Sequence, residues 1–204
     1  MQPPSVAATY FEVFGLPRKL TIDLQALEKS FYKLSRKLHP DLFARADQKE
    51  QEWSLANTSL LNDAYRTLKN PLSRTEYLLK LEGMKIGEED AGTDHRKSQA
   101  RVPADLLEEV FELNMQLDEM RANQQMGEDD PQLRHDLQAA KIEFESQLAG
   151  ADEQLVHLWA DWDAALDQQD EPRMTDLKEK MVSLLDRRRY VRNLVRDVNQ
   201  ALGI

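Results

Sequence analysis

Apolar residues recur at spacings of three and four along most of the chain, with polar residues between them. This pattern predicts amphipathic helices, and no segment shows the strict alternation expected of a half-buried strand. The 204 residues include only seven glycines, whereas the good helix formers Leu, Glu, Gln, Lys and Arg are abundant. The sequence therefore predicts an all-α protein with one or two domains.

Boundary signals divide the first 83 residues into four helices. Thr9 with Glu12, and Asp47 with Glu50, have the spacing of capping boxes. We expect helices at residues 9–14, 23–38, 47–69 and 71–81, with Gly15 and Gly83 as stops. The second and third would form an antiparallel hairpin, and the two short helices would complete an N-terminal domain at residues 1–83.

Residues 84–102 contain glycines and mixed charge, which is typical of a linker. Beyond them, Pro103, Pro131 and Pro172 each precede a periodic apolar run, which predicts three longer helices. Regular stripes need partner helices, so we expect a three-helix bundle at residues 103–204. The stripes of the last two helices include Trp159, Trp162 and Leu184, which we interpret as core positions.

The first bundle helix carries more apolar residues than one face can use. One complete core stripe consists of Leu106, Val110, Leu113, Leu117 and Met120. A second stripe, Leu107, Phe111 and Met115, is displaced by about 100° around the helix. Two interpretations stay open: the helix is buried on two sides, against the bundle and the N-terminal domain, or the second stripe faces another protein.

The net charge of −10 is unevenly distributed. Residues 1–83 contain 12 basic and 10 acidic residues, and the remainder contains 15 basic and 27 acidic residues. The acidic second half argues against nucleic acid as a partner, because phosphate binding depends on clustered Lys and Arg. The sequence has no run of about 20 apolar residues and no basic segment followed by an apolar core at its start, so we expect a cytoplasmic protein without a membrane partner.

The segment "RKLHPDLF", residues 36–43, lies between the second and third predicted helices. His39 should end the second helix, because the residue before a proline is disfavoured in the α conformation, and Asp41 can accept backbone N–H groups in a turn. The solvent side of that helix is basic and carries Lys29, Lys33, Arg36 and Lys37. His39 and Asp41 could form an acid-base or metal pair, but no third ligand or nucleophile is evident, so a protein-binding surface is favoured over an enzyme.

Three segments together resemble one family. They are "YFEVFGLP", "LHPDLF" and "LNDAYRTLKNPLSRTEYLLKLEG", the last at residues 61–83. They resemble the J domain of the HscB co-chaperones, which assist iron-sulfur cluster biogenesis; the His-Pro-Asp triplet is the J-domain signature, and "RTEYLLKLEG" points to HscB. The resemblance implies a J domain linked to a three-helix bundle, in agreement with the helices predicted above.

The resemblance also implies a partner for the triplet. His39, Pro40 and Asp41, together with Lys29, Lys33, Arg36 and Lys37, would dock on the ATPase side of an HscA- or DnaK-type chaperone and stimulate its ATP hydrolysis. The protein itself would catalyse no reaction.

The family binds the scaffold protein IscU through the first bundle helix and an aromatic residue of the last helix. Leu107, Phe111, Glu112 and Glu119 fit the family's contact positions, and Met115 occupies another where an acidic residue is usual. Glu108 stands where an apolar contact is usual. Tyr190 is the best match for the aromatic residue, with Leu184 as a competing alignment. The alternative is a J-domain co-chaperone for a different client, which the departures at Glu108 and Met115 favour.

The chain has no cysteine, so disulfides and thiolate metal sites are excluded. Some HscB-like proteins carry paired cysteines that bind metal before the J domain, and this chain is therefore expected to hold no zinc, cluster or other cofactor. Weak self-association through the bundle stays open.

Overall fold

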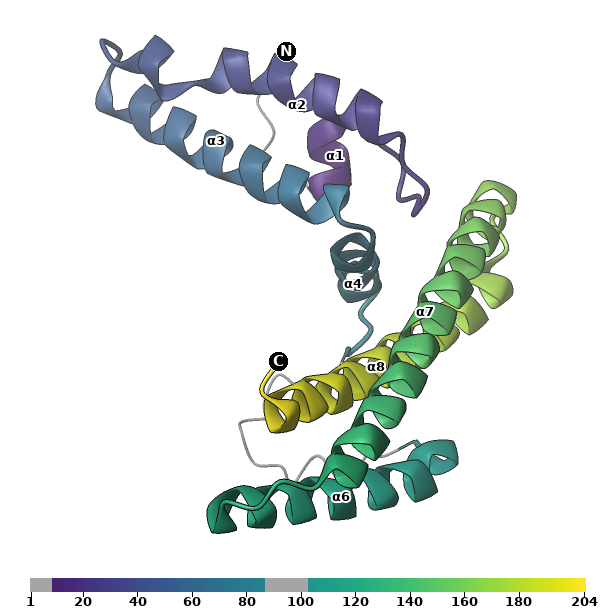
Figure 1. Ribbon diagram of the computed structural model, residues 1–204. Helices are drawn as coiled ribbons and strands as arrows, with labels where there is room; N and C mark the ends of the chain where they lie inside the picture. Colours follow the sequence, from purple (N-terminus) through teal and green to yellow (C-terminus); the bar gives the residue numbers. More distant parts are fainter. Residues whose placement is uncertain (1–8, 87–102) are drawn as a thin grey trace. The chain divides into compact units, whose positions relative to one another are not determined.

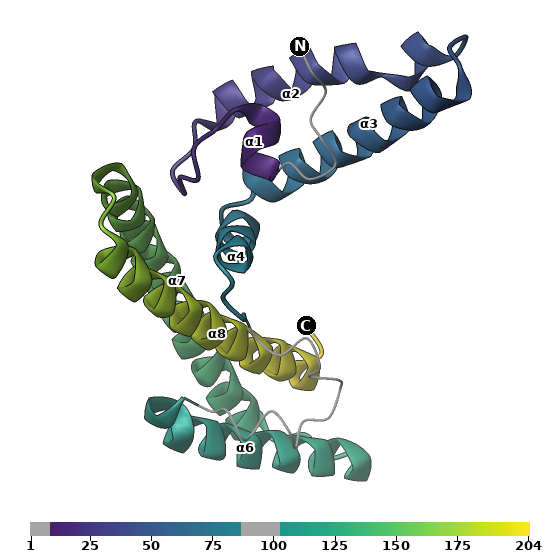
Figure 2. The same ribbon diagram turned by 180° about the vertical axis from the view of Figure 1, so that it is seen from behind.

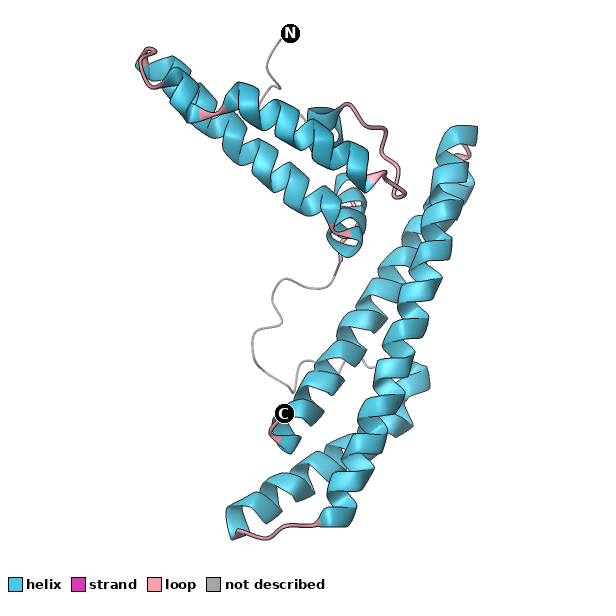
Figure 3. Cartoon of the chain, turned by 45° about the horizontal axis from the view of Figure 1, so that its top comes forward, coloured by secondary structure: helices cyan, strands magenta, loops and turns pink. Residues whose placement is uncertain are grey.

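The computed structural model describes residues 9–86 and 103–204, and the regular secondary structure in these residues is helical, without strands (Figure 3). This confirms the all-α prediction. The helices are α1 (Tyr10–Phe14), α2 (Leu24–Leu38), α3 (Gln48–Lys69), α4 (Pro71–Leu81), α6 (Leu107–Met126), α7 (Pro131–Gln168) and α8 (Glu171–Leu202), with the 3₁₀ turns η1 (Pro40–Phe43) and η3 (Ala104–Leu106). The predicted linker lies mostly outside the described residues. None of the described helices has the length and apolar character needed to cross a bilayer.

Polar side chains immediately before the helices fix where they begin. Thr9 Oγ1 accepts a hydrogen bond from the Glu12 N–H at 3.3 Å, and the Glu12 carboxylate accepts one from the Thr9 N–H at 2.7 Å, which confirms the predicted capping box. The bonds to Thr9 lower the pKa of Glu12. Asp47 caps α3 through the Glu50 N–H at 2.9 Å. Gly15 ends α1 with φ of +65°, a conformation that favours glycine.

Helices α2 and α3 lie side by side as an antiparallel hairpin, with α1 against them (Figures 1 and 2). Their inner faces bury Leu27 and Leu38 of α2 and Leu61, Ala64 and Leu68 of α3. Near the middle of α2, the ring of Phe31 stacks on the ring of Tyr65 from α3, with centroids 4.2 Å apart. The apolar spacing of the sequence thus predicts most of this interface.

The tip of the α7–α8 hairpin packs on the segment between α1 and α2. Of the described residues, those up to 84 and those from 159 to 178 form one compact unit, and the others form the second. Trp162 is fully buried, and its Nε1–H donates to the Arg18 carbonyl at 3.0 Å. The Asp163 carboxylate accepts from the backbone N–H groups of Leu20 and Thr21 at 2.7 and 2.9 Å. A residue predicted as core is therefore buried, but its hydrogen-bond partner is 144 residues away.

Ion pairs surround this contact. Lys19 Nζ lies 2.7 Å from Asp167 Oδ2, and this hydrogen bond raises the pKa of Lys19. Glu82 bridges Arg18 at 3.3 Å and Lys178 at 3.4 Å. Exposed pairs contribute little stability, typically less than about 1 kcal/mol each. Trp162 and Leu20, both fully buried, supply the apolar packing of this contact, and the Glu82–Lys178 pair beside them is itself largely buried.

Helices α6, α7 and α8 enclose the core of the second unit and form the predicted bundle. The buried core residues of these helices are Val110, Leu113, Leu117, Met120, Leu133, Leu137, Phe144, Val191, Leu194, Val195, Val198 and Leu202, with Leu106 of η3. At one end of α6, the Gln124 side-chain amide donates to the Ala201 carbonyl at 2.9 Å. The core stripe predicted for the first bundle helix is buried in full.

On α8, Leu185 takes the buried place predicted for Leu184, and Leu194 is buried in addition to the predicted positions. Leu185 is 4% exposed and Leu184 is only partly buried. A straight helix has 3.6 residues per turn, so its buried face drifts from a strict heptad and passes from Met181 to Leu185. One turn later the stripe contains Arg188, whose guanidinium makes two hydrogen bonds to the Asp152 carboxylate at 2.5 and 3.3 Å. This pairing explains how an arginine is accommodated in an apolar row.

Candidate functional site

The basic face lies on α2, a helix whose start is fixed by a side-chain cap. Asp23 caps the helix through the N–H groups of Gln25 and Ala26 at 2.9 and 3.0 Å. Its exposed side presents the four predicted cations, Lys29, Lys33, Arg36 and Lys37. Within the described residues, none of these four is paired with an acidic side chain. They are therefore available to an acidic surface of another protein.

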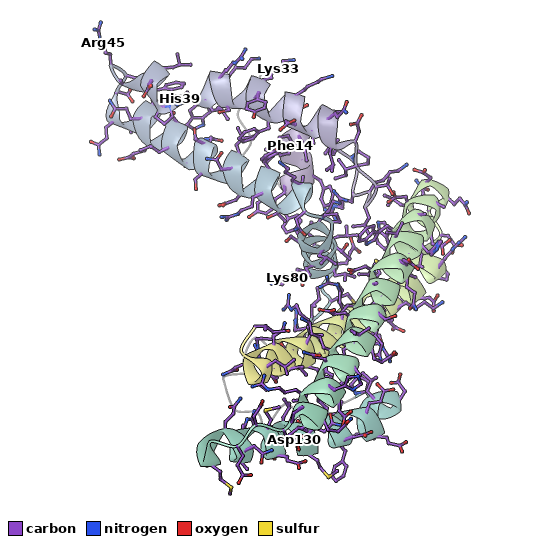
Figure 4. The ribbon with its side chains drawn as sticks, viewed as in Figure 1. Phe14, Lys33, His39, Arg45, Lys80 and Asp130 are labelled. Carbon is purple, nitrogen blue, oxygen red and sulfur yellow. The ribbon has the colours of Figure 1, made fainter. Side chains whose placement is uncertain are left out.

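The predicted triplet follows this face directly. His39 ends α2, as predicted, and Pro40 begins the turn η1. In Figure 4, Lys33 lies on the side of α2 turned away from α3, and Arg45 projects from the loop that joins the two helices. The structure thus brings the basic face and the triplet to one end of the hairpin, and it adds Arg45, an exposed cation that the sequence-based site did not include.

His39 and Asp41 contact each other but are not enclosed. The Asp41 N–H donates to His39 Nδ1 at 3.3 Å, while Asp41 Oδ2 lies 3.5 Å from the same nitrogen. The first contact requires Nδ1 without a proton and the second requires it protonated, so only one forms at a time. The side chains are 52% and 88% exposed. Such exposure suits a contact surface better than an acid-base pair, which depends on a shielded environment.

Helix α3 holds the rest of this loop. The ring of Phe43 packs edge-on against Trp53 at 5.7 Å, and Gln51 Nε2 donates to the Ala46 carbonyl at 3.0 Å. The sequence predicted α3 only as the partner of α2, and these contacts were not predicted. Ser54 and Asn57, polar residues buried on the inner face of α3, are the sequence signal that this face also forms hydrogen bonds; Ser54 bonds to the end of α2.

The second stripe of α6 is exposed. Leu107, Phe111 and Met115 are 54%, 67% and 55% accessible, although the opposite face of the helix belongs to the core. These three side chains therefore take no part in the bundle core, and the stripe is available to a second surface. Glu112 and Glu119, the other predicted contact residues of this helix, are also exposed. Together these five residues form an apolar surface with acidic neighbours, which we call the α6 surface.

Tyr190 of α8 lies near the start of α6. The Asp105 carboxylate in η3, two residues before Leu107, pairs with Arg187, one turn before Tyr190 on α8. This hydrogen bond lowers the pKa of Asp105. Tyr190 is partly buried against the bundle core, and burial raises the pKa of its hydroxyl. Tyr190 is therefore held on the part of α8 that lies beside the η3 turn at the start of α6.

Carboxylates also line a shallow groove between α6 and α7. Glu109 and Glu112 lie on one side of the groove, and Asp136 and Glu143 lie on the other. No group of three or more acidic or histidine side chains among the described residues has the geometry of a metal site. The groove therefore adds negative charge beside the α6 surface.

The helical hairpin with its His-Pro-Asp loop defines the class of protein: residues 9–77 match the family model of the DnaJ domain, and the chain is a J-domain protein. It is 34% identical over 154 residues to the mouse iron-sulfur cluster co-chaperone protein HscB, an alignment that covers 76% of this chain and 61% of the mouse protein. The similarity to HscB therefore extends over most of this chain, beyond the J domain.

Solved structures agree with this assignment. The crystal structure of the human co-chaperone protein HscB is 28% identical, with a TM-score of 0.61 over 98% of this chain and 85% of the human one. The chaperone HscB from Vibrio cholerae is 24% identical, with a TM-score of 0.56 over 95% of this chain and 96% of that chain, and supports the fold alone. The chain spans less than two thirds of the length of the mouse relative.

Proposed function

We propose that this protein is a co-chaperone that binds two partners at separate surfaces. The triplet His39, Pro40 and Asp41 and the basic face of α2 dock on an HscA- or DnaK-type chaperone and stimulate its ATP hydrolysis. The α6 surface, with Tyr190, binds an iron-sulfur scaffold protein of the IscU type. The protein catalyses no reaction itself; it delivers the scaffold to the chaperone and so promotes cluster assembly or transfer.

The observation that carries this proposal is the exposed second stripe on α6. Large apolar side chains that line up on a helix, opposite a complete core, favour a protein partner over a structural role. The family's J domain supplies the other half, because the unpaired cations of α2 suit an acidic chaperone surface. Holding both partners on one chain raises the effective concentration of the scaffold at the chaperone without any new contact.

Reconstitution with purified components tests the proposal. The full-length protein should stimulate single-turnover ATP hydrolysis by an HscA- or DnaK-type chaperone, and added scaffold should increase the stimulation further. Stimulation without any effect of scaffold, and no binding between scaffold and this protein in calorimetry, would instead support a co-chaperone for a different client. The exposed Glu108, next to Leu107 of the α6 surface, is the observation that favours that second candidate.

Replacing Leu107 and Phe111 together by alanine should weaken scaffold binding by at least about thirtyfold, because two apolar side chains that become buried at an interface contribute about 2 kcal/mol or more. Both side chains are exposed, so the thermal unfolding midpoint should change little. Calorimetric titration of the scaffold with the full-length double variant measures the effect.

Ile142 on α7 provides the matched control. It is 67% exposed, as is Phe111, and it does not line the acidic groove. Ile142→Ala should bind the scaffold with wild-type affinity. Equal affinities for the double variant and the wild type would exclude the α6 surface as the client site, while chaperone stimulation would still test the other half of the proposal.

A further inference from the structure

Two hydroxyl groups of α3 bind the last carbonyl of α2. Ser54 Oγ donates to the Leu38 carbonyl at 2.6 Å, and Thr58 Oγ1 donates to the same oxygen at 3.0 Å. Ser54 is fully buried and Leu38 is 8% exposed, so the oxygen is largely shielded from water. The two donors are four residues apart and therefore lie on one face of α3.

The Leu38 carbonyl needs these donors because its own helix cannot supply one. The last four carbonyls of an α-helix have no partner within the helix. The N–H four residues after Leu38 belongs to Leu42, and it donates to the His39 carbonyl at 3.0 Å instead. Pro40 has no N–H. Because an unpaired buried carbonyl is costly, Ser54 and Thr58 hold the last turn of α2 in place against α3.

The far end of the loop is also tied to α3. Beyond the Phe43–Trp53 ring contact, Gln51 Nε2 reaches the Ala44 and Ala46 carbonyls at 3.5 and 3.0 Å. The triplet is therefore flanked by α3 contacts on both sides, whereas the internal His39–Asp41 hydrogen bond is long and exposed. The position of the triplet therefore depends more on contacts with α3 than on the hydrogen bond between its own residues.

We propose that Ser54 and Thr58 are positioning residues for the triplet. By holding the Leu38 carbonyl, they keep His39, Pro40 and Asp41 in the conformation that the chaperone binds. This proposal rests on the proposed function. When only a fraction of the molecules has the conformation that the chaperone binds, the apparent affinity is reduced by that fraction. The maximal stimulation of ATP hydrolysis, reached at saturating co-chaperone, is unchanged. Loss of the two hydroxyls should therefore weaken docking on the chaperone and leave the maximal stimulation of its ATP hydrolysis unchanged.

The test compares full-length variants in single-turnover ATP hydrolysis by a DnaK-type chaperone over a range of co-chaperone concentrations. For the double variant Ser54→Ala, Thr58→Val, the concentration giving half-maximal stimulation should rise about tenfold, as expected when about a tenth of the molecules is competent, with the plateau unchanged. Thr58→Ser keeps the hydroxyl and should behave as wild type. Should the double variant fail to fold, Thr58→Val alone is measured, and its half-maximal concentration should rise in the same direction.

Thr75→Val is the matched control for lost stability. Thr75 is also fully buried, and its hydroxyl donates to the Pro71 carbonyl at 2.9 Å within α4, away from the loop. This variant should stimulate with the wild-type half-maximal concentration. An unchanged value for the double variant, or an equal rise for Thr75→Val, would overturn the proposal.

Amide NMR spectra separate failure of this proposal from failure of the proposed function. The Asp41 and Leu42 amide resonances should move in the double variant and stay in place in Thr75→Val. If the wild type stimulates no DnaK-type chaperone, the proposed function fails, and these spectra still decide whether the hydroxyls position the triplet. Unmoved Asp41 and Leu42 amides in the folded double variant would refute the positioning role.

Discussion

Replacing His39 by glutamine is expected to abolish stimulation of the chaperone ATPase while leaving the fold intact. The imidazole is 52% exposed, and its hydrogen bond from the Asp41 N–H is 3.3 Å long. A long bond between exposed groups contributes less than about 1 kcal/mol, so the free energy of unfolding should change little. The glutamine side chain lacks the imidazole ring that the loop presents to the chaperone. Single-turnover ATP hydrolysis and circular dichroism of the full-length variant measure the two effects.

The control for this prediction is the same substitution elsewhere in the chain. His135 on α7 is also exposed and also lies beside an aspartate, with Nδ1 3.6 Å from Asp136 Oδ1. His135→Gln should stimulate as the wild type does. Normal stimulation by His39→Gln would remove the triplet from the proposed chaperone site, and with it the reason for assigning α2 to that surface.

Local signals predicted the helices of this chain because their causes act over three or four residues. The capping box at Thr9 and Glu12, the cap at Asp47 and the stop at Gly15 are each complete within one turn of the chain. His39 ends α2 for an equally local reason, the steric effect of Pro40. Such features require no knowledge of the rest of the fold.

The α6 surface could be predicted for a different reason. A helix with one complete core stripe has no room in the same core for Phe111 and its neighbours, so the sequence alone limits the choice to a second burial site or a partner. In the structure, Leu107, Phe111 and Met115 lie outside the bundle core, as this argument requires. The assignment of these residues to a particular client rests on the family.

Contacts between distant parts of the chain could not be predicted in this way. The Leu38 carbonyl meets hydroxyls 16 and 20 residues away, and Trp162 meets a carbonyl 144 residues away. Hydrophobic periodicity shows which side of a helix is buried but not which segment covers it. For this reason Trp162 was assigned to the bundle core, whereas its hydrogen-bond partner, Arg18, lies in the N-terminal part of the chain.

Truncating Trp162 to alanine is expected to lower the free energy of unfolding by about 3–5 kcal/mol, the range observed when a large buried aromatic side chain is removed. The ring is fully buried, and its loss would also leave the Arg18 carbonyl without its indole donor. Trp162→Phe keeps a ring in place but removes the N–H, so it should cost about 1–3 kcal/mol. Urea unfolding of the full-length variants, followed by circular dichroism, measures both.

Trp159, one turn earlier on α7, is the control for the same truncation. It is only partly buried, and its Nε1 has no hydrogen-bond partner among the described residues. Trp159→Ala should therefore cost less than Trp162→Ala. Equal losses at the two positions, or a loss of under about 1 kcal/mol for Trp162→Ala, would contradict the packing of the hairpin tip on the segment from Arg18 to Thr21. A graded series would show that burial of the Trp162 ring is a main source of stability where this tip packs on the J domain.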